Sequence, residues 1–81
     1  MTNADLNNAV HMLAENMITY LGISIDKENF ANTNDDLGIL AKTCTKAEWK
    51  QVARTAFDLA CTEAVSEDHR EKIVASYCHM L

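Results

Sequence analysis

Three cysteines and three histidines are the side chains of this 81-residue chain best suited to metal binding. Zinc sites are usually marked by close pairs such as Cys-x2-Cys, because a single turn then supplies two ligands. The chain has no such pair, and the adjacent Cys78 and His79 would point about 100° apart on a helix. His11 and Glu15 share a helix face, but it lies opposite the apolar stripe described below. We therefore expect no metal site and no cofactor.

Thiol chemistry is the second possibility, since Cys44, Cys61 and Cys78 are all potential nucleophiles. A nucleophilic cysteine needs a base and an orienting group beside it, and the sequence places neither. Free cysteine is more often a small buried apolar group. An odd number of cysteines, and an N-terminus without the basic and apolar segments of a secretory signal, favour free thiols in a reducing cytoplasm. We expect a protein that is not an enzyme, with a thiol- or metal-dependent activity as an alternative.

The charge of the chain is −5 and is unevenly distributed. Residues 1–45 carry six acids and two bases, whereas residues 46–65 carry three of each. An acidic surface repels nucleic acid and membrane, and attracts basic protein surfaces. Lys46, Lys50 and Arg54 follow one flank of a predicted helix, which is the single feature favouring nucleic acid. The overall charge outweighs it, so we expect no direct nucleic-acid binding, and no apolar stretch is long enough to cross a membrane.

The elements that position these groups are predicted to be helices. Proline is absent and glycine occurs only twice, although both residues normally mark turns and strand ends. We predict an all-α fold, a small single-domain bundle over residues 1–81. It has three main helices near 3–21, 46–65 and 67–80, with one or two short helices between the first two. Capping boxes at Thr2 and Thr45 mark the starts of the first two main helices.

Apolar spacing predicts which helix faces pack together. In the first helix, large apolar residues recur at steps of three or four, the period of one helix face: Leu6, Val10, Leu13, Met17 and Leu21. Gly22 follows, where a left-handed residue can end the helix. The 46–65 helix instead carries a seam of small residues, which allows another helix to approach closely: Ala53, Ala56, Ala60 and Ala64.

The segment 23–45 is the hardest part of the sequence to assign. Asp26 can cap a single helical turn that reaches Phe30, and the polar residues 32–36 are typical of a loop. Either Asp35 or Asp36 can cap a second short helix. Gly38 within that helix is unfavourable by its intrinsic propensity.

Small size, acidity and the lack of a catalytic motif favour a protein that acts by binding another protein. The most concrete form is an inhibitor or antagonist that occupies a basic surface of its target, such as a phage-encoded inhibitor of a host defence complex, or an immunity protein. The predicted contact residues are the acids of the 26–36 region: Asp26, Glu28, Asp35 and Asp36.

A structural role is the remaining alternative. Met12, Ile18 and Val74 lie outside the predicted core stripes, and apolar groups in such positions indicate a second packing face or a partner surface. A helical subunit that forms a homodimer would use them for self-association.

Overall fold

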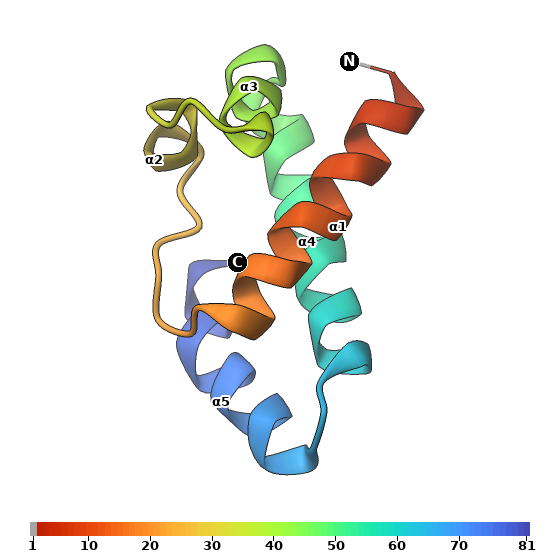
Figure 1. Ribbon diagram of the computed structural model, residues 1–81, viewed down its shortest axis with the longest axis vertical. Coiled ribbons are helices and arrows are strands. Elements are labelled where there is room, and N and C mark those ends of the chain that lie inside the picture. Colours follow the sequence, from red (N-terminus) through yellow and green to blue (C-terminus); the bar gives the residue numbers. More distant parts are fainter. Residues whose placement is uncertain (1) are drawn as a thin grey trace.

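The computed structural model describes residues 2–81, and the chain over that range forms helices joined by short connections (Figure 1). The elements in chain order are α1 (Asn3–Thr19), α2 (Lys27–Ala31), α3 (Asp36–Thr43), α4 (Lys46–Glu63), α5 (Glu67–Tyr77) and the 3-10 helix η1 (Cys78–Met80). No strand occurs among these residues. The predicted all-α bundle of three main helices is therefore confirmed, and of the predicted one or two short helices between the first two the structure has two, α2 and α3.

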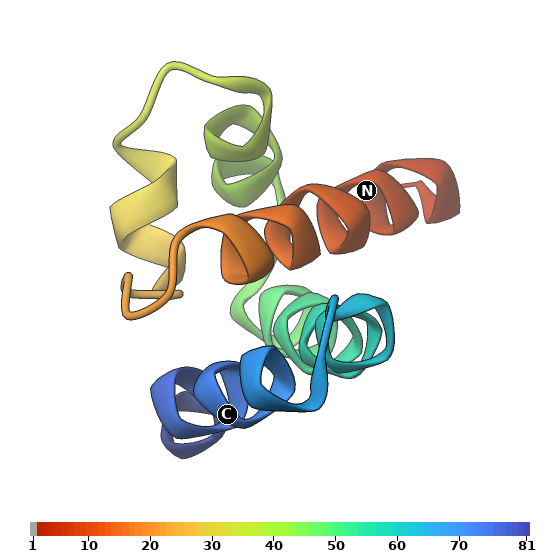
Figure 2. The ribbon, with the colours of Figure 1, turned by 60° about the horizontal axis from the view of Figure 1, so that its bottom comes forward.

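The long helices α1 and α4 form the centre of the bundle and lie against each other in both ribbon views (Figures 1 and 2). Each begins at the predicted capping box, in which a threonine hydroxyl accepts from the third backbone N–H of the helix and the acid there accepts from the threonine N–H. Leu13 and Met17 of α1 are fully buried, as are Ala56 and Ala60 of α4. The small alanine side chains of α4 thus leave room for the large side chains of α1.

The first helix is shorter than predicted, because it ends at Thr19 and not at residue 21. Gly22 has a φ of 85°, in the left-handed region, and the chain turns away there toward α2. The last turn of the predicted 67–80 helix tightens into η1, and α4 ends two residues early at Glu63. Leu21 consequently leaves the helical stripe, but it still packs against the core.

The C-terminal helix α5 closes the bundle against α4 and the end of α1. Ile73 and Tyr77 are fully buried on its inner face, as their spacing predicts. The Tyr77 hydroxyl donates to the backbone carbonyl of Tyr20, and the His69 ring lies 3.0 Å from the carbonyl oxygen of Ile18. Two polar contacts therefore hold the last helix to the end of the first.

The short helices α2 and α3 pack against each other at the end of the bundle where α4 begins (Figure 1). Asp26 caps α2, and of the two candidates for α3 the structure uses Asp35. Gly38 is buried so close to the preceding turn that a Cβ there would lie 2.5 Å from the carbonyl oxygen of Thr33. The glycine therefore allows α3 to pack closely against that turn, despite its poor helix propensity.

None of the helices in the described range is both long enough and apolar enough to cross a membrane. The residues that we expected outside the main stripes divide into two kinds. Met12 and Ile18 are half-buried and pack against the core, whereas Val74 is exposed. The first two therefore belong to the packing of the bundle itself.

Candidate binding surface

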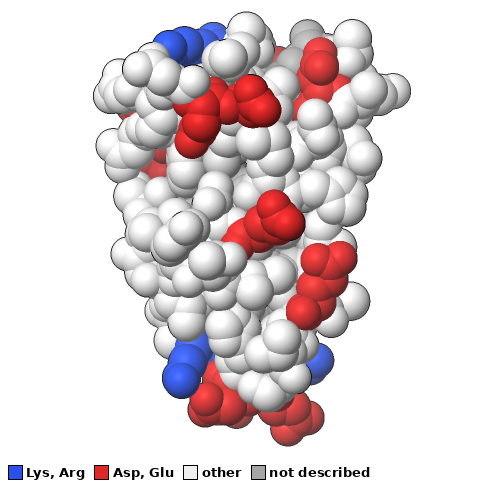
Figure 3. All heavy atoms as spheres, in the orientation of Figure 1, with Lys and Arg blue, Asp and Glu red and all other residues white. Residues whose placement is uncertain are grey.

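The four predicted contact acids are all exposed and lie at the starts of α2 and α3. Figure 3 shows one face of the molecule, on which carboxylates occur at the end occupied by α2 and α3, at the centre and at the opposite end, while Lys and Arg lie at the edges. The structure separates the four acids into two pairs. Asp26 and Glu28 line a surface pocket, and Asp35 and Asp36 do not.

Two of the four acids also hold the backbone in place. The Asp26 carboxylate accepts from the Glu28 N–H at 3.4 Å, and Asp35 accepts from the Gly38 N–H at 2.7 Å and from the Thr33 hydroxyl at 2.8 Å. Hydrogen bonding with Glu28 lowers the pKa of Asp26, and the bond from Gly38 N–H lowers the pKa of Asp35. Both groups therefore stay negatively charged at neutral pH, but neither is free to be replaced without a structural cost.

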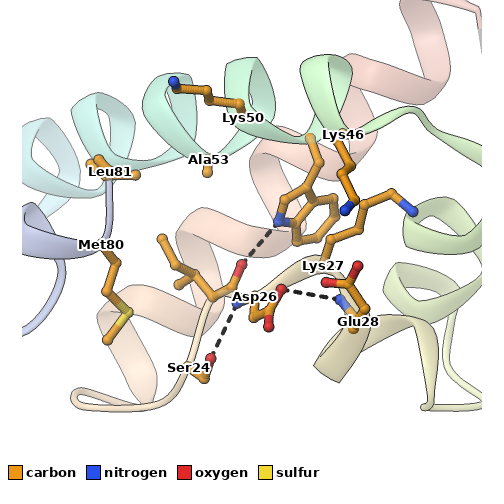
Figure 4. Close-up of a pocket in the computed structure, with 11 residues that line it drawn as sticks. Ser24, Asp26, Lys27, Glu28, Lys46, Lys50, Ala53, Met80 and Leu81 are labelled. Carbon is orange, nitrogen blue, oxygen red and sulfur yellow. Dashed lines mark hydrogen bonds between the residues drawn. The ribbon is translucent and has the colours of Figure 1, made fainter.

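The pocket beside Asp26 has a volume of about 570 Å³ and lies between the 24–28 segment, the first half of α4 and the C-terminal residues Met80 and Leu81. Trp49 and Ile25 are buried residues in its wall. The Trp49 indole N–H donates to the Ile25 carbonyl oxygen at 2.9 Å, so the helix holds the extended segment in place (Figure 4). Phe30 packs beside the indole with its ring centroid 5.6 Å away.

Charged side chains of both signs surround this pocket. Lys27, Lys46 and Lys50 contribute three positive charges, against the two carboxylates of Asp26 and Glu28. The pocket is thus locally positive in a protein of charge −5. Sequence reasoning missed it, although the basic flank of α4 and the neighbouring Trp49 were visible signals. These two signals did not show that the 24–28 segment lies against this side of α4.

A second hollow, of about 480 Å³, lies between the first half of α1 and the first half of α4. Leu6, Val10 and Val52 supply its apolar lining, and Glu48 is its one charged residue among those described. Leu6 and Val10 belong to the predicted core stripe of α1, but they are only half-buried because α4 covers them incompletely.

The thiols and imidazoles do not gather into one site. Cys44 is buried, Cys61 half-buried and Cys78 exposed, and all three are free. Burial raises the pKa of the Cys44 and Cys61 thiols, which disfavours the reactive thiolate. Within residues 2–81, no three His, Cys, Asp or Glu side chains are arranged to hold a metal ion. His11 and Glu15 are both exposed on α1, as we predicted.

Comparison of the chain with protein-family models, with curated proteins and with solved structures found no match.

Proposed function

We propose that this protein acts in the cytoplasm by binding another protein, through the carboxylates at the starts of α2 and α3. Its most concrete form is an inhibitor or antagonist that covers a basic surface of its target, as a phage-encoded inhibitor of a host defence complex or an immunity protein would. The observation that carries the proposal is the exposure of all four acids on one pair of adjacent short helices.

The electrostatics support this proposal in two ways. Asp26 and Asp35 have lowered pKa values, so their charges persist at neutral and mildly acidic pH. Opposite charges on the two partners increase the rate of encounter and favour one orientation of docking. Binding of this kind weakens as salt is added, because the Debye length falls from about 30 Å at 0.01 M to about 10 Å at 0.1 M.

A homodimer has less support from the surface. The large apolar side chains with the greatest exposure are Tyr20, Ile39, Val65, Val74 and Met80. Ile39 lies in α3 and Val65 in the α4–α5 connection, and these elements are at opposite ends of the bundle (Figure 1). Ile39 and Val65 therefore cannot contribute to the same continuous patch.

The test uses charge reversals that spare the capping acids. Glu28→Lys with Asp36→Lys removes two of the proposed contact charges, and Glu15→Lys with Glu71→Lys makes the same change of net charge on α1 and α5. The partner is first captured from the source cells with the tagged protein and then purified. Calorimetric titration of each variant with that partner follows, at low and moderate salt.

We expect the Glu28/Asp36 variant to bind at least tenfold more weakly, a loss of about 1.4 kcal/mol. The Glu15/Glu71 variant should bind nearly as well as the original protein. Equal weakening by both variants would show only a general charge effect. Unchanged binding by the Glu28/Asp36 variant would exclude the start of α2 and α3 as the contact surface.

A further inference from the structure

The pocket beside Trp49 differs in character between its two ends. Figure 4 shows Lys27, Lys46 and Glu28 at one end, and Met80 with Leu81 at the other. Ala53 of α4 lies between them. The volume of the pocket, about 570 Å³, falls within the range of about 300–1,000 Å³ that is typical of small-ligand pockets. A molecule that fits both ends needs a charged head and an apolar body.

Four polar groups in the wall of the pocket are hydrogen-bonded to one another in pairs. The Trp49 indole N–H and the Ile25 carbonyl oxygen bond to each other, and the Ser24 hydroxyl accepts from the Asp26 N–H at 3.2 Å. An apolar chain placed there leaves none of these groups without a partner. This removes the main cost of covering polar wall atoms with hydrocarbon.

The polar end offers two ammonium groups to a negative head. Figure 4 shows Lys27 and Lys46 there beside Glu28, whereas the nitrogen of Lys50 points away from them on α4. The one direct salt bridge among residues 2–81 joins Lys72 to Asp68, so neither Lys27 nor Lys46 is in direct contact with a carboxylate oxygen. Asp26 already accepts hydrogen bonds at the start of α2, and the charge of Lys46 helps to lower the pKa of its carboxyl.

We propose that this pocket binds a single-chain anionic amphiphile of the long-chain carboxylate class. Its head lies beside Lys27 and Lys46, and its hydrocarbon chain extends along Ile25 and Ala53 toward Met80. The pocket shares Asp26 and Glu28 with the proposed contact surface for a protein, but the test of amphiphile binding needs no partner.

The test is a titration with sodium dodecanoate below the concentration at which it forms micelles. Trp49 is the sole tryptophan of the chain, so its emission reports on the pocket directly. We expect saturable binding at one site per molecule, seen by fluorescence and by calorimetry. Dodecyltrimethylammonium and dodecyl maltoside have the same chain with a cationic and a neutral head, and both should bind more weakly.

Two variants with matched controls locate the site. Lys46→Gln should raise the dissociation constant about fivefold, about 1 kcal/mol, whereas Lys42→Gln on α3 should leave it unchanged. Met80→Asp places a charge at the apolar end and should weaken binding more than tenfold. Val65→Asp, at an 85% exposed position outside the pocket, should not. Circular dichroism confirms that each variant is folded.

Three results would overturn the proposal. The first is the absence of any saturable signal with dodecanoate. The second is equal or tighter binding of the cationic or neutral amphiphile, which would assign the polar end to a different head. The third is unchanged dodecanoate binding by both Lys46→Gln and Met80→Asp, which would place the ligand elsewhere on the molecule.

Discussion

The α1–α4 pair and the α2–α3 pair are both two helices packed together, but they are stabilised differently. The long pair buries large side chains against a seam of alanines, and Leu13 is completely inaccessible there. In the short pair, α2 has no buried residue. The Asp26 carboxylate accepts a backbone N–H at the start of α2, the Thr33 hydroxyl donates to the Phe30 carbonyl at its end, and Asp35 accepts a backbone N–H at the start of α3. Short helices are marginal on their own, so they depend on such local contacts. The same contacts leave carboxylates at the surface, where a partner can reach them.

The largest expected effect is in the long pair. Leu13→Ala should lower the free energy of unfolding by about 3 kcal/mol, because it removes buried hydrocarbon and leaves a cavity beside the alanine seam. Urea denaturation followed by circular dichroism measures this value. A loss below about 1 kcal/mol would mean that the burial of Leu13 contributes little to the stability of the long pair.

The second effect tests the closest approach in the short pair. Gly38→Ala should destabilise the protein by about 2 kcal/mol, because the new Cβ would meet the backbone of Phe30 and Thr33. In an ordinary helix interior the same substitution stabilises by about 1 kcal/mol. Urea denaturation therefore distinguishes the two cases by sign, and a stabilised variant would show that α3 can move away from the turn.

The third effect tests the cap of α3 and its pH dependence. Asp35→Ala should cost about 1 kcal/mol at pH 7, the usual contribution of such a cap. The pKa of Asp35 is lowered in the folded protein, so its contribution is complete above the unfolded value of about 3.9 and is lost as the pH falls through the folded value. The difference in stability from the original protein should therefore be constant from pH 7 to pH 5 and shrink below pH 4. A difference that grew on acidification would contradict this assignment.

The smallest expected effect distinguishes Asp35, which caps α3, from the neighbouring acid Asp36. Asp36→Asn should change stability by about 0.3 kcal/mol, because Asp36 contributes only a negative charge in the first turn of α3. Thermal unfolding of Asp35→Ala and Asp36→Asn side by side makes the comparison. Equal losses for the two variants would remove the distinction between the two adjacent acids.

The sequence predicted the long helices well because their signals are local. Capping boxes at Thr2 and Thr45 and the steps between apolar residues are readable without tertiary information. The role of Gly38 was not readable, since it depends on a contact with the preceding turn. The end of α1 was placed two residues too late, because periodicity continues to Leu21 although the backbone turns at Gly22.

Less of the candidate surface could be predicted. The exposure of the four acids followed from their types, whereas the structural use of Asp26 and Asp35 depends on the exact starts of α2 and α3. The pocket could not be predicted because the two segments that line it, residues 24–28 and 46–53, are distant in sequence. The burial of Ile25 in the core and the hydrogen bond from Trp49 to its carbonyl bring the two segments together, and no local pattern encodes these contacts.

The three cysteines form a graded set of probes for local opening. Cys78 is exposed, Cys61 is half-buried and Cys44 is buried at the end of α3. A maleimide should label them in that order, because a buried thiol reacts only when its surroundings open. Mass spectrometry after short pulses would then show whether α3 detaches before the α1–α4 pair unfolds. Labelling of Cys44 at urea concentrations that leave the long helices intact would reveal the short pair as a separate cooperative unit.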